Sequence, residues 1–305
     1  MRPLRGLPAG LLGFALCTGT ISDTVPERHP VFAGGYRVLA ADFHVHPFPQ
    51  SAGTLMPWDI AIEARHQGLD AIAMAPHNQV IWGQLGRWFS RTFGGPIVLA
   101  SEEIHGPRFH LIAAGIHRTV SWRLTAAQAI HEIHRQGGVA IAAHPTSSAW
   151  PAYFANGAID QLDGTEVLQP IAFSGEQPAR ELRAFYRRSH AAAIGSSDYH
   201  GIGPLGVCRT YVFVREATEA GILDAIRARR TVVLDGAQAY GDPEVLKLAT
   251  GGGPFGAPIP PSPWHRFLAA ASAVSGTLGM LALALARPRP CTMELHGNPD
   301  SIRVS

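Results

Sequence analysis

The side chains of this sequence that could do chemistry gather at the ends of short apolar runs. His44 and His46 close one such run, and their spacing of two residues puts both imidazoles on the same side of a strand. Two imidazoles that project together suit a divalent transition metal. Asp42 stands two residues earlier, where its carboxylate could orient one imidazole by a hydrogen bond. The run therefore favours a metal-binding role.

Comparable side chains close other apolar runs along the chain. They are His77, Glu102 with Glu103, His144, and Asp198 with His200. Each is a weak signal alone, because a lone histidine at a strand end is more often structural than a ligand. Burying so many imidazoles and carboxylates together is unfavourable unless a cation neutralises them. A site with more than one metal ion explains the whole set.

A serine nucleophile is the alternative at the last of these runs. Ser196 and Ser197 precede Asp198 and His200. No nucleophile-elbow motif surrounds these serines, so nothing else in the sequence supports that chemistry.

The apolar runs predict strands that alternate with helices. The expected strands are 38–45, 71–75, 97–100, 110–116, 139–143, 164–168, 192–195 and 210–214, and the expected helices are 57–67, 125–136, 178–189 and 218–229. Continuous apolar strands in β–α order predict a parallel sheet or barrel. The carboxyl ends of such strands share one face, so the candidate ligands should converge there. His110 opens its run and fits this scheme less well.

Composition bounds the class of protein. The 305 residues are 46% hydrophobic and 16% charged, which is typical of a globular chain with a sizeable core. A net charge of +2 provides no general surface for polyanions, so no nucleic-acid partner is expected. Cys17, Cys208 and Cys291 cannot form a disulfide framework, and their spacing fits no zinc knuckle.

Both ends of the chain carry apolar segments. Arg2 and Arg5 precede a short apolar run, so residues 1–20 are interpreted as a signal peptide or an N-terminal anchor. Residues 267–286 are 20 residues without a charge. At about 1.5 Å per residue they reach the ~30 Å thickness of a hydrocarbon core. We expect a transmembrane helix over 264–287, with a buried helix of a soluble protein as the alternative.

The remaining segments follow from these assignments. Residues 36–236 form the body, 237–263 a Gly/Pro-rich linker that holds no helix from residue 242 on, and 288–305 a short tail. Arg287 and Arg289 after the span should stay inside, as should the arginines of the N-terminus. The body is then expected outside the cytoplasm, anchored to the membrane.

In their order, the motifs resemble those of the polymerase and histidinol phosphatase (PHP) family. The resemblance covers about 38–235, roughly two thirds of the chain. It rests on Asp42-Phe43-His44-Val45-His46, on Gly68–Ala73 with Pro76-His77-Asn78, on Glu103-Ile104 with His110-Leu111-Ile112, on Gly137-Gly138-Val139 with Ala143-His144-Pro145, on Gly195–His200 and on Ile226–Thr231. Any one motif is weak, whereas the ordered set is highly specific.

The resemblance implies a distorted (β/α)7 barrel that holds two or three divalent metal ions, which could be Zn, Mn or Fe. It assigns the first metal to His44, His46, Glu103 and Asp198. It assigns a third metal to Glu103, His110 and His144, with Glu103 as a bridge, and a second to His77 and His200. It also implies a phosphoesterase, in which two cations bridge and activate a water and clamp a substrate oxygen.

Two departures from the family pattern fall on the second metal. The family usually has an acid or a histidine about five residues past the second histidine of the first motif, whereas residues 47–53 contain neither. The family's Thr-Asp-His is Ala75-Pro76-His77 here. Glu102 remains an alternative to Glu103 as the bridging ligand, and His105 lies within reach of the site.

Five other histidines are expected in solvent on helices or turns. They are His66, His117, His131, His134 and His190. Arg108 is expected at the surface, with contact to an anionic substrate as the alternative.

Three functions compete. The first is a metal-dependent phosphoesterase that acts on a small phosphate ester and is held at a membrane by its C-terminal helix. The second is a hydrolase of a carboxylic ester, amide or carbamate that uses the same metal site. The missing acidic ligand favours this second function. The third is a metal-binding envelope domain without catalysis, against which the complete first and third ligand sets argue.

Overall fold

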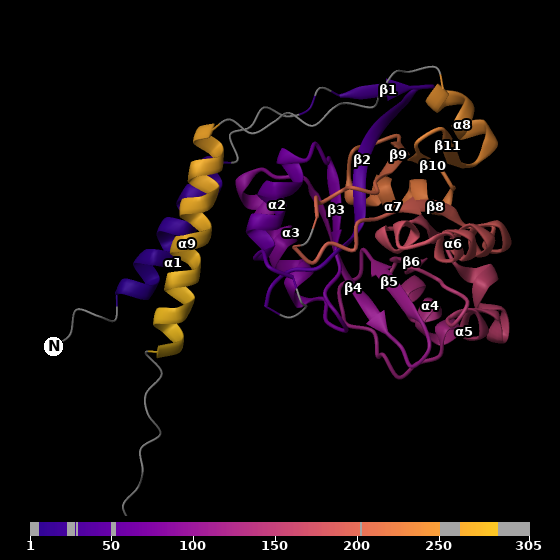
Figure 1. Ribbon diagram of the computed structural model, residues 1–305, viewed down its shortest axis with the longest axis horizontal. Helices are drawn as coiled ribbons and strands as arrows, with labels where there is room; N and C mark the ends of the chain where they lie inside the picture. The colour runs from indigo at the N-terminus through magenta and orange to yellow at the C-terminus, as the bar shows by residue number, and fades with distance from the viewer. Residues whose placement is uncertain are drawn as a thin grey trace, which may run out of the picture.

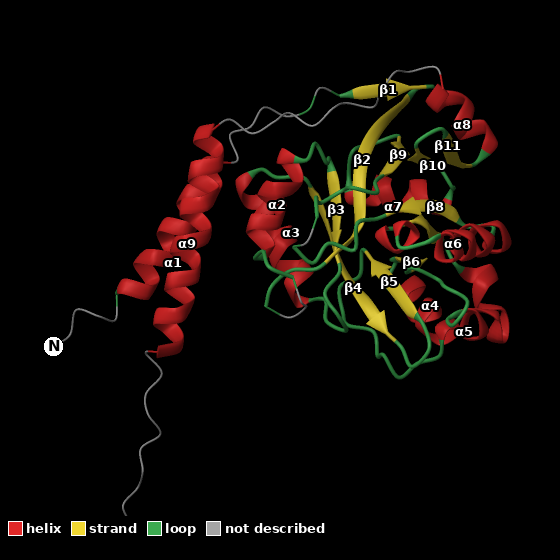
Figure 2. Cartoon of the chain, in the orientation of Figure 1, coloured by secondary structure: helices red, strands yellow, loops and turns green. Residues whose placement is uncertain are grey.

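The computed structural model describes residues 6–22, 28, 30–49, 53–201, 203–250 and 263–285 (Figure 1). A mixed sheet curls into a nearly closed barrel, and helices cover its outside (Figure 2). Two apolar helices, α1 (Leu7–Ser22) and α9 (Pro263–Leu285), lie together beside this body. The expected α/β barrel followed by an apolar C-terminal helix is therefore confirmed.

The strands run through the sheet in the order β11-β10-β9-β2-β3-β4-β5-β6-β7-β8, and β1 pairs with β2. Their bounds are β1 Val31–Ala33, β2 Tyr36–Val45, β3 Ala71–Met74, β4 Ile97–His105, β5 His110–Ala114, β6 Val139–Ala142, β7 Gly164–Leu168, β8 Ala192–Gly195, β9 Thr210–Val214, β10 Thr231–Asp235 and β11 Gln238–Gly241. From β2 to β8 the strands follow chain order. β10 packs against β8, which brings the two ends of the sheet together.

The sheet is not parallel throughout. β2, β3 and β4 are parallel, as are β6, β7 and β8. β5 runs antiparallel to β4 and β6, and β9 runs antiparallel to β2, so the prediction of a parallel sheet is wrong at these strands. Residues 106–109 join β4 to β5 as a hairpin, which is too short for the crossover that a parallel connection needs. The first residue of β5 consequently lies at the edge where β4 and β6 end.

The helices around the barrel are α2 Pro57–His66, α3 Ile81–Phe93, α4 Ala126–Arg135, α5 Trp150–Phe154, α6 Glu176–Ser189 and α7 Glu219–Arg227. The four expected helices correspond to α2, α4, α6 and α7. α3 was not predicted, because Gly83 and Gly86 lower the helix propensity of its sequence. A Cβ atom at Gly83 would lie 2.7 Å from the carbonyl oxygen of Met74, so this glycine allows α3 to approach β3 closely.

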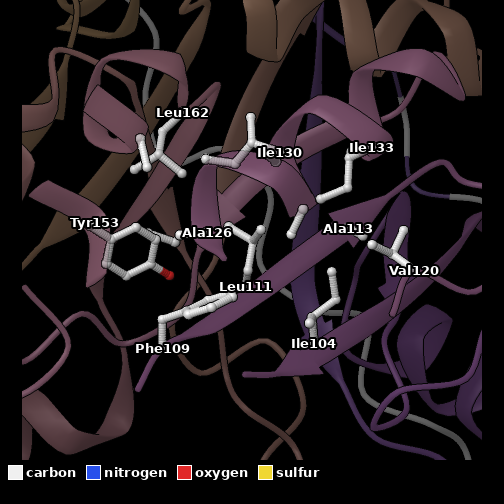
Figure 3. Close-up of a cluster of buried hydrophobic side chains, with 14 of the residues drawn as sticks. Ile104, Phe109, Leu111, Ala113, Val120, Ala126, Ile130, Ile133, Tyr153 and Leu162 are labelled. Atoms are coloured by element: carbon white, nitrogen blue, oxygen red, sulfur yellow. The ribbon is translucent and has the colours of Figure 1, made fainter. Parts of the chain in front are cut away.

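Apolar side chains fix the helices to the outer face of the sheet. In Figure 3, Ile104 of β4 and Leu111 of β5 belong to the same buried cluster as Ile130 and Ile133 of α4. Burial of each such side chain contributes about 1.5–3 kcal/mol. A second cluster, which includes Phe43, fills the interior of the barrel. The strand ends therefore stand on a packed scaffold.

The body extends further along the chain than expected. The prediction that residues 242–263 hold no helix is wrong at their start, where α8 spans Pro243–Thr250. A proline in the first turn of a helix is tolerated, because its nitrogen would have no intrahelical partner there. Val245 of α8 is buried against β2, β9 and β10. The remainder of the expected linker, 251–262, lies outside the described residues.

α1 and α9 pack antiparallel along each other (Figure 1). The Ser272 hydroxyl donates to the Ala15 carbonyl oxygen at 2.8 Å, and the Ser275 hydroxyl donates to the Leu11 carbonyl oxygen at 2.6 Å. One turn after Ser275, Gly279 leaves room for α1, because a Cβ atom there would lie 2.9 Å from a side-chain carbon of Leu12. Small residues spaced four apart on α9 thus form the contact surface for α1.

The apolar length of α9 matches a bilayer. In the described part of the chain, Phe267–Leu285 is the helix long and apolar enough to cross a membrane. The apolar stretch of α1, Leu7–Thr18, is shorter.

Candidate metal centre

The eight ligands expected from the sequence lie at one rim of the barrel. His44 and His46 are at the end of β2, His77 follows β3, Glu103 lies near the end of β4, His110 begins β5, His144 follows β6, and Asp198 and His200 follow β8. Their ligand atoms form several overlapping groups of three. Separate segments of the chain thus deliver imidazoles and carboxylates to one place.

Glu103 stands at the centre of this cluster. Its Oε2 lies 3.3 Å from His44 Nε2, 3.6 Å from His46 Nε2 and 3.3 Å from His77 Nε2. Its Oε1 lies 3.0 Å from His110 Nδ1 and 3.2 Å from His144 Nε2. The two oxygens of one carboxylate therefore face two separate sets of imidazoles.

Asp198 and His200 approach from the loop after β8. Asp198 Oδ1 lies 3.1 Å from His46 Nε2 and 3.5 Å from His44 Nε2. The ring of His200 stacks on that of His46 with centroids 4.1 Å apart, and it lies 6.1 Å from the ring of His77. Val45 and Tyr199 form a parallel bridge that fixes this loop to the end of β2.

The direction of β5 explains why His110 reaches the rim. Because β5 is antiparallel to its neighbours, its first residue lies beside the last residues of β4 and β6. The hydroxyl of Tyr153, which is fully buried, donates a hydrogen bond to the His110 carbonyl oxygen. The hairpin thus explains why His110 lies at the rim although it begins its strand.

The alternation of side chains along β4 separates the two adjacent glutamates. Glu103 faces the imidazoles, whereas Glu102 points away and accepts a hydrogen bond from the Val120 amide at 2.6 Å. Burial raises the pKa of Glu102 to about 7. Of the two glutamates, Glu103 has the geometry of a bridging ligand.

Glu166 of β7 is a member of the site that sequence reasoning missed. Its Oε1 lies 2.9 Å from His44 Nδ1, and its Oε2 accepts the backbone N–H of His144 at 2.6 Å. The side chain is fully buried. The sequence feature that could have indicated this role was a glutamate in the middle of a strand that is predicted to be buried.

The role expected of Asp42 belongs to Glu166. Asp42 Oδ1 accepts the backbone N–H groups of His44, at 3.2 Å, and of Ser197, at 3.0 Å, and Oδ2 accepts the Gly206 N–H at 2.9 Å. Burial raises the pKa of Asp42 to about 6 despite these hydrogen bonds. Asp42 therefore joins backbone segments below the site and orients no imidazole.

Two of the candidate ligands have unusual backbone angles. His144 has φ of 27° and Asp198 has φ of 48°, a region that side chains other than glycine seldom adopt. Such conformations persist only where surrounding contacts impose them, and they concentrate at functional sites. The bond from the His144 N–H to Glu166 is one of these contacts.

Burial and charge shift the pKa values of the cluster in opposite directions. Burial lowers the pKa of His46 to about 3. Burial also opposes the charged form of His44, but the carboxylates of Glu103, Glu166 and Asp198 outweigh it and raise the pKa of His44 well above its usual range. Against its own burial, the charge of His44 and hydrogen bonds from neighbouring imidazoles hold the pKa of Glu103 well below its usual range. The surroundings of His44 thus favour positive charge at this point.

The donor set fits divalent metal ions. Nδ1 of His44 faces Glu166, and its buried Nε2 has no hydrogen-bond partner while it points toward the oxygens of Glu103 and Asp198. In the neutral imidazole this nitrogen's lone pair would face two carboxylates, which is unfavourable unless a positive charge, either a proton or a metal ion, lies between them. Groups of three ligand atoms, each within 4.8 Å of the others, include His44/His46/Glu103, Glu103/His110/His144 and His46/His77/His200. Imidazole and carboxylate together suit Zn, Mn or Fe.

A cavity opens beside this cluster. It has a volume of about 480 Å³, and His110, His144 and Arg108 are among its lining residues. Arg108 is exposed, as expected, and it also contributes to this cavity.

Of the five histidines expected in solvent, one differs from the prediction. His117, His131 and His190 are exposed, and His134 pairs with Asp163 near the surface at 2.7 Å. His66 is buried on α2, so its expected solvent exposure is wrong. It lines a small cavity between α2 and α9, and α9 covers this side of α2.

Comparisons with known proteins agree with this architecture. Residues 178–231 match a family model described as PHP-associated. An uncharacterized protein of Methanocaldococcus jannaschii is 28% identical over 141 residues, which cover 42% of this chain and 81% of the relative.

One of the solved structures that resemble this chain shares its fold. A two-domain protein from Bacteroides vulgatus, which contains a predicted PHP-like metal-dependent phosphoesterase, superposes with a TM-score of 0.58 and 22% identity over 74% of this chain and 73% of that chain. An amidohydrolase from Chromobacterium violaceum superposes with a TM-score of 0.45 and 13% identity over 65% of this chain and 99% of that chain.

The PHP-associated segment and the shared barrel fold both support the resemblance to the PHP family. The fold of this chain and its His/Glu cluster fit a metal-dependent hydrolase.

Proposed function

We propose that this protein is a metal-dependent phosphoesterase. The observation that carries the proposal is the convergence of imidazoles from separate strands on both oxygens of Glu103. The first ion would be held by His44, His46, Glu103 and Asp198. A further ion would be held by Glu103, His110 and His144, and His77 with His200 would contribute to another. When bound, such ions polarise a phosphoryl oxygen and lower the pKa of water.

The surroundings of the cluster support an anionic small molecule as substrate. The cavity beside His110 and His144 has room for one, at about 480 Å³. Arg108 at its edge carries a positive charge that can pair with the outer oxygens of a phosphate. Glu166 would keep Nε2 of His44 directed at the metal site by holding Nδ1.

The second candidate is hydrolysis of a carboxylic ester, amide or carbamate at the same site. It is favoured by the absence of an acid or histidine from residues 47–53, which leaves the His77 and His200 set short of a ligand. Weaker binding of the second ion would lower the positive charge of the site. This loss would weaken the binding of a phosphate dianion more than that of a neutral carbonyl compound, because the dianion depends more strongly on the charge.

The helix pair supports attachment to a membrane. α1 and α9 are antiparallel and hydrogen-bonded through Ser272 and Ser275, so the first residue of α1 and the last residue of α9 lie at the same end of the pair. In the sequence, Arg2 and Arg5 precede α1, and Arg287 and Arg289 follow α9. A cytoplasmic location for both arginine pairs satisfies the preference for positive charge inside. The barrel would then lie outside, on a two-helix anchor whose N-terminal helix is retained.

Activity assays separate the two functions. The full chain, purified in detergent and loaded with Mn²⁺ or Zn²⁺, should hydrolyse p-nitrophenyl phosphate and should lose this activity with a chelator. His44→Ala should reduce the rate by more than ~100-fold. His131→Ala, on the exposed face of α4, serves as the matched control and should leave the rate unchanged. Turnover of p-nitrophenyl acetate alone would favour the second function, and metal binding without either activity would contradict both.

A further inference from the structure

The incomplete second ligand set poses a specific question about this chain. The family completes that set from the loop after its first motif, but residues 47–53 offer no acid or histidine. His46 is the third member of the group with His77 and His200, but it is assigned to the first ion. His77 and His200 alone would hold an ion weakly, because protein metal sites generally use at least three protein ligands.

His105 lies where a further ligand is needed. It is the last residue of β4, two residues beyond Glu103, so both side chains emerge on the same face of the strand. Its Nε2 lies 2.8 Å from Glu103 Oε2, and its ring lies 3.9 Å from that of His77 between centroids. One ligand atom from each of these residues lies within 4.8 Å of the other two.

Backbone contacts hold His77 and His105 side by side. The His105 N–H donates to the side-chain oxygen of Asn78 at 2.9 Å, and the Asn78 N–H donates to the Glu103 carbonyl oxygen at 2.9 Å. In addition, the Glu103 N–H donates to the Pro76 carbonyl oxygen at 3.0 Å. The loop after β3 is thereby joined to β4, and the two imidazoles are positioned without help from a metal.

Hydrogen bonds alone cannot account for the crowding around Glu103 Oε2. Imidazole nitrogens of His44, His46 and His77 lie within 3.6 Å of this oxygen, and His105 is the nearest at 2.8 Å. A carboxylate oxygen offers two lone pairs, so it cannot accept hydrogen bonds from four imidazoles. Cations would let these nitrogens act through their own lone pairs instead.

We propose that His105 is a metal ligand and that it forms a site with His77 and Glu103. Two imidazoles and one carboxylate are a donor set that catalytic zinc sites use, with the fourth position left open. The inference rests on the proposed function, since it assumes that the cluster binds divalent ions. His105 would replace the ligand that the first-motif loop does not supply.

Zinc titration tests this role without an activity assay. The full chain, His105→Ala and the control His131→Ala are dialysed against chelator-buffered Zn²⁺, and bound zinc is counted by mass spectrometry. We expect His105→Ala to lose about one equivalent, or to bind its weakest zinc at least ~10-fold less tightly, while His131→Ala matches the unchanged protein. The stronger equivalents should remain, because His44, His46, His110, His144 and Asp198 are intact.

The other outcomes of the titration are equally informative. An unchanged zinc count and affinity in His105→Ala would overturn the role of His105 and leave the proposed function standing. No bound zinc in the unchanged protein would overturn both. His105→Gln, which keeps most of the volume, provides a second variant, and thermal unfolding with EDTA checks that each variant folds. In the unchanged protein, zinc should protect His105 from diethyl pyrocarbonate, and unprotected modification at saturating zinc would contradict the proposal.

Discussion

At the scale of single residues, Glu166 determines which nitrogen of His44 is offered to a metal. Its carboxylate holds Nδ1 of His44 and the backbone N–H of His144 together. We predict that Glu166→Gln weakens zinc binding by about 10–100-fold. The amide has one acceptor oxygen and cannot accept both hydrogen bonds, and without the negative charge it does not increase the basicity of the His44 imidazole. Competition with a chelator measures the change. Glu176→Gln, at an exposed glutamate on α6, should have no effect, and equal affinities of the two variants would contradict this role.

Arg108 carries the prediction about substrate charge. Arg108→Ala should raise KM for a phosphate monoester by about tenfold through loss of a charged hydrogen bond, with kcat and metal content nearly unchanged. KM for an uncharged carboxyl ester should not move. Arg118→Ala, at another exposed arginine outside the cavity, is the control. If Arg108→Ala leaves KM for the phosphate monoester unchanged, the guanidinium does not contact the substrate.

The predicted ligands that the structure brings together at the rim are those in recognisable motifs. His44 and Asp198 stand at strand ends, whereas His110 opens its strand and was assigned through the order of the family motifs. Glu166 carries no such mark, because residues 164–168 read as an ordinary buried strand. The partners of Asp42 depend on how the loop at Gly206 folds back, which local spacing does not reveal.

At the scale of elements, strand direction was the feature that apolar patterning could not give. Both parallel and antiparallel strands read as continuous apolar runs when they are buried on two faces. The short connection of residues 106–109 was the available sign that β5 turns back. The start of α8 was missed for a different reason, since the Gly/Pro-rich composition beyond residue 250 concealed the helix before it.

The contact between α9 and α2 should depend on pH through Asp59. Burial raises the pKa of Asp59 to about 6 from an ordinary value of 3.8, and a hydrogen bond with Ser272 of α9 opposes this only in part. Because the packed state favours the protonated carboxyl, the contact should be fully stable below the ordinary pKa and weaken as pH rises through about 6.

Photo-cross-linking measures this contact. Benzoylphenylalanine at position 269, which lines a cavity together with α2 residues, should cross-link to α2 more strongly near pH ~4 than near pH ~8. In Asp59→Asn the yield should stay high at both values. The same pH dependence in Asp59→Asn would show that another group is responsible.

The pairing of α1 with α9 can be trapped by a disulfide. A Cβ atom at Gly276 would lie 3.5 Å from the Cβ of Ala15, within the range of a disulfide. With Cys17 and Cys291 replaced by serine, Ala15→Cys with Gly276→Cys should oxidise readily in the full-length protein. Val274→Cys, on an exposed face of α9, should not pair with Ala15→Cys. A mature protein without α1 would contradict the two-helix anchor.

At the scale of the whole molecule, the barrel gathers at one rim side chains that are far apart in the sequence, and α1 and α9 gather both ends of the described chain at one place (Figure 1). The class of fold and the convergence at the rim were predictable, since both follow from β–α order and from polar residues at strand ends. The small residues spaced four apart on α9 indicate a contact with another helix, but this local pattern does not reveal that α1 is the partner.

A zinc anomalous-scattering map of the crystallised protein tests the central claim most directly. We predict at least two peaks at the rim, each about 2.0–2.2 Å from an oxygen of Glu103 and from imidazole nitrogens of the surrounding histidines. A rim without peaks, with His44, Glu103, His144 and Asp198 turned away from one another, would contradict a shared metal centre.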